Sequence, residues 1–193
     1  MIITIASQSS GPAKAVVANY LALLRARSGR KVMLLDADPQ HAACAWCHAH
    51  AAAGIRPRVD ARAISGPCLP QLLESLRLRY NDIVIDTEGR DTLESRAALI
   101  AARLVLVPVT LDQVDLASQY QLIARLNAAR MFNPDLRVLF VILGQAGDPT
   151  ADEIAAVRSY VTRVMSATLA GIVLHHPCAP DEMDALYREV FAH

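Results

Sequence analysis

Three groups of polar residues have types and a spacing that could perform phosphate chemistry. Lys14 ends a polar segment, 7–15, which follows an apolar run and precedes a helical pattern. Asp36 and Asp38 follow a second apolar run, and Asp86 follows a third. A loop before a helix N-terminus directs backbone N–H groups toward an anion, and a lysine there can reach phosphate oxygens. Carboxylates beside such a loop can hold Mg²⁺ and orient an attacking water.

Each of these groups also has a purely structural explanation. The complete phosphate-binding loop reads G-x-x-x-x-G-K-[ST], but here Ala13 precedes Lys14 and Ala15 follows it. The segment could therefore be an ordinary polar loop between a strand and a helix. Each aspartate could cap the next helix, a position that aspartate favours. Three aspartates at the ends of apolar runs, together with Lys14, favour the phosphate interpretation.

Bringing these residues together requires a parallel sheet. Apolar runs predict strands at 2–6, 32–35, 83–85, 104–109, 138–143 and 172–174, with another at 58–64. Helical patterns occupy 13–27, 41–53, 69–79, 93–102, 114–131, 151–165 and 181–191. This alternation predicts a doubly wound, mainly parallel α/β sheet of about seven strands with helices on both faces. Ligands of such sheets bind at the carboxyl ends of the strands, where Lys14 and the aspartates would lie.

The composition fits one domain spanning residues 1–193. The chain has 19 Lys+Arg and 19 Asp+Glu, and 53% of its residues are hydrophobic. Zero net charge excludes a strongly basic nucleic-acid coat but leaves a local patch open. No apolar run reaches the ~20 residues of a membrane-spanning helix. With no secretory-signal pattern and only four cysteines, we expect a cytoplasmic protein with reduced thiols.

Four segments carry a family resemblance: MIITIASQSSGPAKAVVANYLA (1–22), VMLLDADPQHAACAW (32–46), NDIVIDTEGR (81–90) and LVLVPVTLDQVDL (104–116). They resemble, in order, the phosphate-loop segment, the D-x-D-P-Q segment, the Walker B strand and the V-P-V segment of the ParA/MinD family of deviant Walker P-loop ATPases. The chain is most similar to the small ParA-type partition proteins. The resemblance implies a P-loop NTPase fold.

The resemblance also implies roles for individual residues. Asp38 would be the catalytic residue linked to hydrolysis, and Asp36 and Asp86 would act around Mg²⁺. Gly89 would lie in the switch loop that senses the γ-phosphate. The nucleotide-binding loop would consist of Ser9, Ser10, Gly11, Pro12, Ala13, Lys14 and Ala15.

The chain departs from the family pattern where the chemistry is most demanding. Ser9 replaces the signature lysine that reaches across a dimer, and Ser10 and Ala13 replace two loop glycines. Ala15 replaces the hydroxyl residue that binds Mg²⁺. Removing one group that acts on developing phosphate charge typically costs ~10²–10³ in rate. We therefore expect weak binding of ATP, ADP and Mg²⁺, and weak or absent ATP hydrolysis.

Two functional hypotheses follow. The first is a ParA-like protein of plasmid or chromosome partition, or of mobile-element DNA maintenance, with an impaired nucleotide site. The second is a non-catalytic pseudo-ATPase adaptor that binds a protein partner. The resemblance implies a ParB-like or other protein partner, non-specific DNA and a homodimer. An amidotransferase-type synthetase of the wider family is disfavoured because no further catalytic motif is present.

Two other patterns have competing interpretations. Cys44-Ala45-Trp46-Cys47-His48 reads as the C-x-x-C-H haem-attachment string, and His41, Cys44 and His48 share a helix face that could hold zinc. Helix residues without a metal are the alternative, and we expect neither haem nor zinc.

The basic residues either form a DNA-binding patch or lie on solvated helix faces; they are Arg25, Arg27, Arg30, Lys31, Arg125, Arg130, Arg158 and Arg163.

Overall fold

The computed structural model describes residues 1–8, 12–65, 68–111, 116–144, 147–175 and 177–191. Its strands are β1 (Ile2–Ile5), β2 (Val32–Ala37), β3 (Asp60–Ala63), β4 (Asp82–Thr87), β5 (Leu104–Thr110), β6 (Arg137–Gly144) and β7 (Ala167–His175). Its helices are α1 (Pro12–Arg27), α2 (Ala42–Ala52), α3 (Leu69–Arg77), α4 (Leu93–Ala101), α5 (Leu116–Phe132), α6 (Ala151–Val161) and α7 (Pro180–Phe191).

In the described part of the chain, the strands form one seven-stranded sheet in the order β3-β2-β4-β1-β5-β6-β7. Every neighbouring pair is parallel. Unbroken Val, Ile and Leu runs suit strands covered on both faces, and all four residues of β1 and all six of β4 are buried. The prediction of a doubly wound parallel sheet of about seven strands is confirmed.

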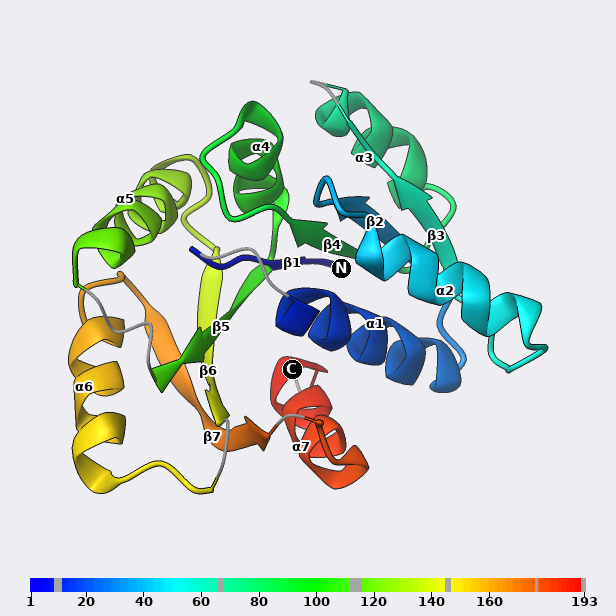
Figure 1. Ribbon diagram of the computed structural model, residues 1–193. Coiled ribbons are helices and arrows are strands. Elements are labelled where there is room, and N and C mark those ends of the chain that lie inside the picture. Colours follow the sequence, from blue (N-terminus) through cyan, green and yellow to red (C-terminus); the bar gives the residue numbers. More distant parts are fainter. Residues whose placement is uncertain (9–11, 66–67, 112–115, 145–146, 176, 192–193) are drawn as a thin grey trace.

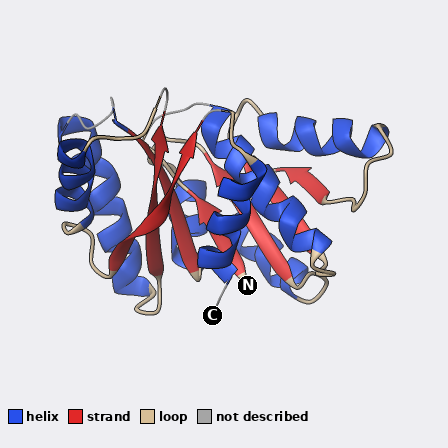
Figure 2. Cartoon of the chain, turned by 90° about the horizontal axis from the view of Figure 1, so that it is seen from below, coloured by secondary structure: helices blue, strands red, loops and turns tan. Residues whose placement is uncertain are grey.

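The helices cover the two faces of the sheet unequally (Figure 1). Helices α1, α2 and α7 pack together on one face. Helices α3, α4, α5 and α6 contribute to the two apolar clusters on the other face. Figure 2 shows the strands as a twisted layer with helices on either side. The central strands are therefore removed from water on both faces, while their ends remain available for chemistry.

No helix in the described residues is both long and apolar enough to cross a membrane.

Candidate functional site

The register of the sheet places the predicted site residues together at the carboxyl ends of β1, β2 and β4. Strand β4 lies between β2 and β1. Asp86 pairs with Asp36 of β2 on one side and with Ile5 of β1 on the other. The chain leaves β1 toward α1, which carries Lys14, and leaves β2 through Asp38. The structure thus brings together Lys14, Asp36, Asp38 and Asp86; Ser9, Ser10 and Gly11 lie outside the described residues.

Lys14 lies in the first turn of α1 and is 2% exposed. Its Nζ forms an ion pair with Oδ2 of Asp38 at 3.5 Å. The first-turn N–H groups of a helix have no partner within the helix, and with the helix dipole they favour a nearby anion. Lys14 adds a full positive charge at the same end of α1. The combination suits a phosphate group.

Asp36 has a structural role in addition to its position at the strand end. The side chain is fully buried. Its Oδ1 accepts a hydrogen bond from the Asp38 backbone N–H at 3.1 Å, and its Oδ2 accepts one from the Cys44 N–H at 2.8 Å. His41, the N-cap residue of α2, supplies no side-chain cap. Asp36 therefore takes the place of an N-cap for α2, as the structural interpretation of the aspartates predicted.

Asp86 is a buried carboxylate with a raised pKa. It is 2% exposed, and burial raises its pKa to about 7. Lys14 opposes this rise, whereas the negative charges of Asp36 and Asp38 add to it. Its Oδ1 is buried without a hydrogen-bond partner. A buried acceptor of this kind normally has a partner, so Asp86 is the group in this cluster best suited to a cation or its water shell.

The fit to Mg²⁺ is incomplete. Both oxygens of Asp36 already accept backbone hydrogen bonds, and Asp38 pairs with Lys14. Ala15 offers no side-chain oxygen, and its methyl group packs in the apolar cluster that includes α1. The described residues contain no group of three or more His, Cys, Asp or Glu side chains arranged to hold a metal. Mg²⁺ in proteins often uses only one or two carboxylates plus substrate phosphates, a role that Asp86 could fill.

A groove of about 280 Å³ opens beside Asp38. The loop after β1 contributes Gln8 to its wall, the loop after β2 contributes Gln40, and the loop after β4 contributes Glu88 and Gly89. Three loops that follow neighbouring parallel strands therefore share one hollow. This is the location at which open α/β sheets bind ligands.

Sequence reasoning misplaced Arg125. It grouped this residue with basic side chains of a DNA-binding patch or a solvated face, but Arg125 is 9% exposed. Its Nη1 donates to the Arg90 carbonyl at 2.9 Å, and its Nη2 donates to the Gly89 carbonyl at 3.1 Å. Arg125 therefore holds the loop after β4. The spacing of apolar residues indicates this burial. Arg125 comes three residues after Leu122 and four before Ala129, on the apolar face of α5.

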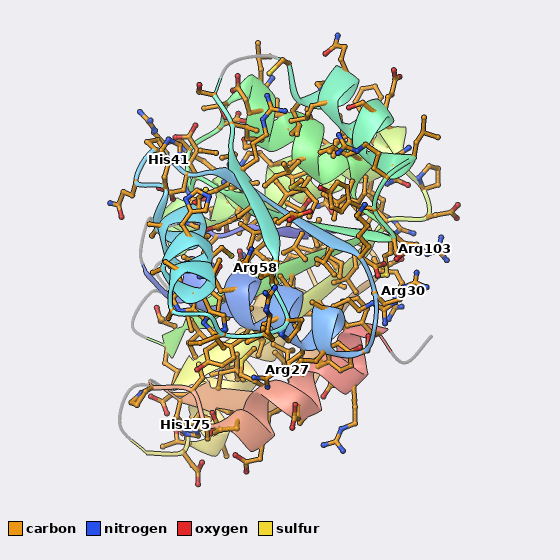
Figure 3. All side chains as sticks on the ribbon, turned by 90° about the vertical axis from the view of Figure 1, so that its right-hand side faces the viewer. Arg27, Arg30, His41, Arg58, Arg103 and His175 are labelled. Carbon is orange, nitrogen blue, oxygen red and sulfur yellow. The ribbon has the colours of Figure 1, made fainter. Side chains whose placement is uncertain are left out.

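Other basic residues are also engaged within the protein. The Nε atoms of Arg25 and Arg30 donate to Asp82 at 2.8 and 3.1 Å. Figure 3 shows His41 and His175 at the end of the molecule that holds the strand carboxyl ends, and Arg30 and Arg103 at the opposite end. Arg27, Lys31, Arg158 and Arg163 are exposed, so any DNA-binding surface would have to use residues of this kind.

The Cys-His segment forms the first turns of α2. Cys44 and Cys47 are buried, and Cys44 Sγ lies 3.8 Å from His48 Nε2. Burial raises the pKa of the Cys47 thiol to about 12. A cysteine binds a metal as the thiolate, and this buried environment disfavours the thiolate of Cys47. The expectation that this segment holds neither zinc nor haem stays a prediction.

Comparison with known proteins places this arrangement in a family. The model of the CobQ/CobB/MinD/ParA nucleotide binding domain matches residues 3–176. The chain belongs to this family. It is 28% identical over 168 residues to the chromosome-partitioning ATPase Soj of Thermus thermophilus, covering 73% of this chain and 68% of Soj. The family resemblance predicted from the four sequence segments is confirmed.

Solved structures share the fold of this family member. A putative plasmid partition protein from Borrelia burgdorferi bound to AMPPNP is 18% identical with a TM-score of 0.73, covering 100% of this chain and 98% of that one. Cobyrinic acid a,c-diamide synthase from Mycobacterium smegmatis, with a bound ATP analog and magnesium, is 17% identical with a TM-score of 0.73. That match covers 97% of this chain and 91% of the synthase.

Proposed function

We propose that this protein is a ParA-like component of plasmid or chromosome partition, or of mobile-element DNA maintenance, whose nucleotide site is impaired. One observation carries the nucleotide assignment: Lys14, at the start of α1, contacts Asp38 beside the buried Asp86. A lysine and two carboxylates at a helix N-terminus provide a cation for phosphate and anions for Mg²⁺. The partition role is supported by the likeness to Soj and to the Borrelia partition protein.

In this proposal the protein binds ATP or ADP weakly and hydrolyses ATP slowly or not at all. Lys14 is the phosphate-binding residue of the loop 9–15, Asp38 is the residue linked to hydrolysis, and Asp36 and Asp86 lie around Mg²⁺. The impairment is attributed to the missing loop glycines, to the missing signature lysine at Ser9, and to Ala15, whose methyl group belongs to the core. A methyl group at Ala13 also hinders the close approach of backbone to phosphate.

The partners in this proposal are a ParB-like or other protein, non-specific DNA and a second copy of the chain, in the cytoplasm. Zero net charge means that DNA binding would depend on a local cluster of exposed arginines, which a dimer would double. The whole chain is taken as one nucleotide-binding domain.

Calorimetric titration of the full chain with ATP and ADP, with and without Mg²⁺, tests the nucleotide assignment. We expect weak binding with little effect of Mg²⁺. The variant Lys14→Met should lower the association constant at least about tenfold, because hydrogen bonds to charged groups contribute ~1.5–3 kcal/mol. Lys31→Met is the matched control, because Lys31 is the other lysine of the chain and is exposed. Equal affinities of wild type and Lys14→Met would remove the assignment.

The second candidate is a pseudo-ATPase adaptor that uses the fold to bind a protein partner. The observation that favours it is the buried ion pair between Lys14 and Asp38, which compensates the lysine charge within the chain itself. A partition ATPase must change its oligomeric state or DNA affinity with ATP, whereas an adaptor need not. Wild-type protein that binds neither ATP nor ADP in the titration would favour the adaptor.

A further inference from the structure

A cavity of about 450 Å³ lies between α4 and α5, on the sheet face opposite α1. Its apolar wall includes Leu99 and Ile100 of α4, and Ala124, Ala128 and Phe132 of α5. Phe132 is 75% exposed and Ile100 38% exposed, so apolar surface continues from the cavity to the outside. The volume falls within the range of small-molecule sites, which are mostly apolar with a few convergent polar groups.

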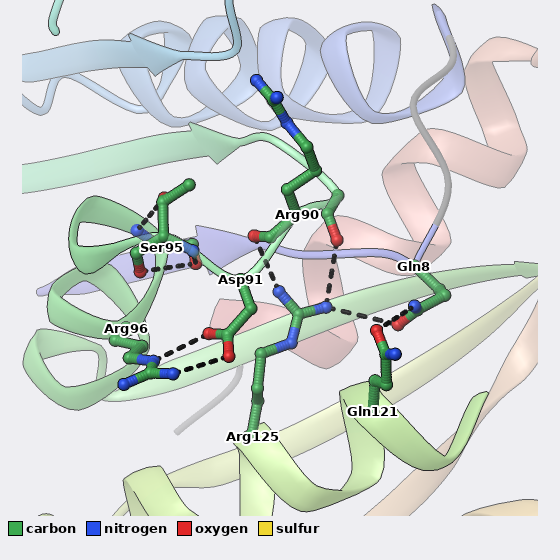
Figure 4. A network of polar contacts seen from close by, with 9 residues as sticks. Gln8, Arg90, Asp91, Ser95, Arg96, Gln121 and Arg125 are labelled. Carbon is green, nitrogen blue, oxygen red and sulfur yellow. Dashed lines mark hydrogen bonds and ion pairs between the residues drawn. The ribbon is translucent and has the colours of Figure 1, made fainter. Parts of the chain in front are cut away.

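Three charged residues line the same cavity, and two of them neutralise each other. The Nε and Nη2 atoms of Arg96 donate to the two carboxylate oxygens of Asp91 at 2.8 and 2.7 Å. This bidentate pair (Figure 4) satisfies both groups. Arg125 is the third charged residue of the wall, so one positive charge remains.

Arg125 is a buried cation bonded to neutral acceptors. Its guanidinium donates to the carbonyls of Arg90 and Gly89 and, at 3.3 Å, to the side-chain amide oxygen of Gln8. Figure 4 shows these contacts converging from two loops on one side chain. Within the described residues it forms no ion pair within 4.0 Å, and its Nε is buried without a hydrogen-bond partner. Burial lowers the pKa of Arg125, and the negative charge of Asp91, which is bonded to Arg96, only partly opposes this.

We propose that the cavity between α4 and α5 binds a small organic acid, with its apolar body against Leu99, Ala128 and Phe132 and its carboxylate at Arg125. A buried charge without an opposite charge in contact is costly, and a carboxylate supplies that charge together with acceptors for the unused N–H donors. The apolar wall requires an apolar body. A neutral compound would leave Arg125 without an opposite charge in contact, and a purely polar anion would leave the apolar wall uncovered.

This ligand would act on the strand-end site as well. Arg125 is bonded to Gly89 in the loop after β4 and to Gln8 in the loop after β1, and both residues line the groove beside Asp38. A carboxylate on the unused N–H donors of Arg125 therefore binds the same side chain that holds these two loops. The cavity and the candidate nucleotide site therefore share one side chain, although the binding proposal does not depend on nucleotide.

Titration of the full chain with decanoate, followed by calorimetry below its micelle-forming concentration, tests the proposal. Decanol is the uncharged control of the same chain length. Ala128→Trp fills the cavity from an exposed helix position. Ala156→Trp is its matched control at an exposed position of α6, outside the cavity lining. Arg125→Gln removes the charge, and circular dichroism verifies that each variant is folded.

We expect wild type to bind one decanoate at least about tenfold more tightly than decanol, since the charged contact is present only with the acid. Ala128→Trp should weaken decanoate binding at least about tenfold, and Ala156→Trp should leave it within about twofold. Arg125→Gln should remove the preference for the acid. Three results would each overturn the proposal: no decanoate binding to wild type, equal affinities for decanoate and decanol, or unchanged binding by Ala128→Trp. All three remain decisive if Arg125→Gln fails to fold, because none of them uses that variant.

Discussion

Asp82, at the start of β4, is a buried charge that the chain compensates internally. It is 1% exposed and accepts hydrogen bonds from Arg25 and Arg30. Burial alone would raise its pKa, but the hydrogen bonds from the two arginines, together with the N-terminal ammonium group 3.1 Å from Oδ1, lower it below the ordinary value. A depressed native pKa stabilises the fold above the unfolded-state pKa of ~3.9. That stabilisation is lost as the pH falls through the native pKa.

Asp82→Asn should therefore lower the free energy of unfolding by about 2–3 kcal/mol at pH 7, since it removes hydrogen bonds between charged groups. Urea unfolding at a series of pH values measures this. The difference from wild type should be largest near neutral pH. It should begin to shrink below about pH 4, where the carboxylate of the unfolded chain becomes protonated, and should be lost once the pH falls below the lower native pKa. Asp135→Asn, at an exposed position, is the control. A difference that persists unchanged at low pH would contradict the ion-pair explanation.

At the candidate site, the sequence predicted which residues meet but not how they are paired. Lys14, Asp36, Asp38 and Asp86 were found because each follows a recognisable strand. That Asp36 caps α2 depends on the chain path between Asp38 and Cys44, which local sequence does not determine. The burial of Arg125 depends equally on the loop after β4, whose carbonyls it binds. Such partnerships arise from tertiary packing and have no signature in a single segment.

At the scale of elements, apolar runs located the strands but not always their ends. Strand β4 begins at Asp82 rather than Ile83. A charged residue is not expected in a buried strand from its hydropathy, but Arg25 and Arg30 compensate the charge of Asp82. Strand β7 covers Ala167–His175, where 172–174 was predicted. It is an edge strand with partly exposed residues, so its apolar run is shorter than the strand. Helix α6 ends at Val161 rather than 165, before Ser166 adopts a left-handed φ of 56°.

Helix α6 also offers a test of helix capping. Thr150 accepts a hydrogen bond from the Glu153 N–H, and the Glu153 carboxylate accepts one from the Thr150 N–H at 2.8 Å. This reciprocal pair is a capping box. Thr150→Ala should lower the free energy of unfolding by about 1 kcal/mol, measured by urea denaturation. Ser159→Ala, at an exposed position of the same helix, should change it by less than about 0.5 kcal/mol. Equal effects of the two changes would argue against the box.

At the scale of the whole molecule, the parallel sheet separates chemistry from structural support. The carboxyl ends of β1, β2 and β4 carry the candidate nucleotide site, while Asp82 and its arginines lie at the opposite end of β4. The proposed impairment is confined to residues 9–15, so it can be reversed without rebuilding the fold.

Assembly should therefore respond to repair of the loop. The family resemblance implies an ATP-bound dimer in which the signature lysine of one subunit reaches the nucleotide of the other, and Ser9 cannot supply that charge. We expect the mass of wild type in solution, measured by light scattering after gel filtration, to be the same with and without Mg-ATP, and its ATP turnover to be near background.

The combined variant Ser9→Lys, Ala13→Gly and Ala15→Thr should bind Mg-ATP at least about tenfold more tightly, since it restores charged and hydrogen-bonding contacts. Adding Lys14→Met to that variant should abolish the gain, because Lys14 is the proposed phosphate ligand. Wild-type protein that dimerises only with Mg-ATP, or that turns ATP over faster than the repaired variant, would show that the loop is functional as it stands.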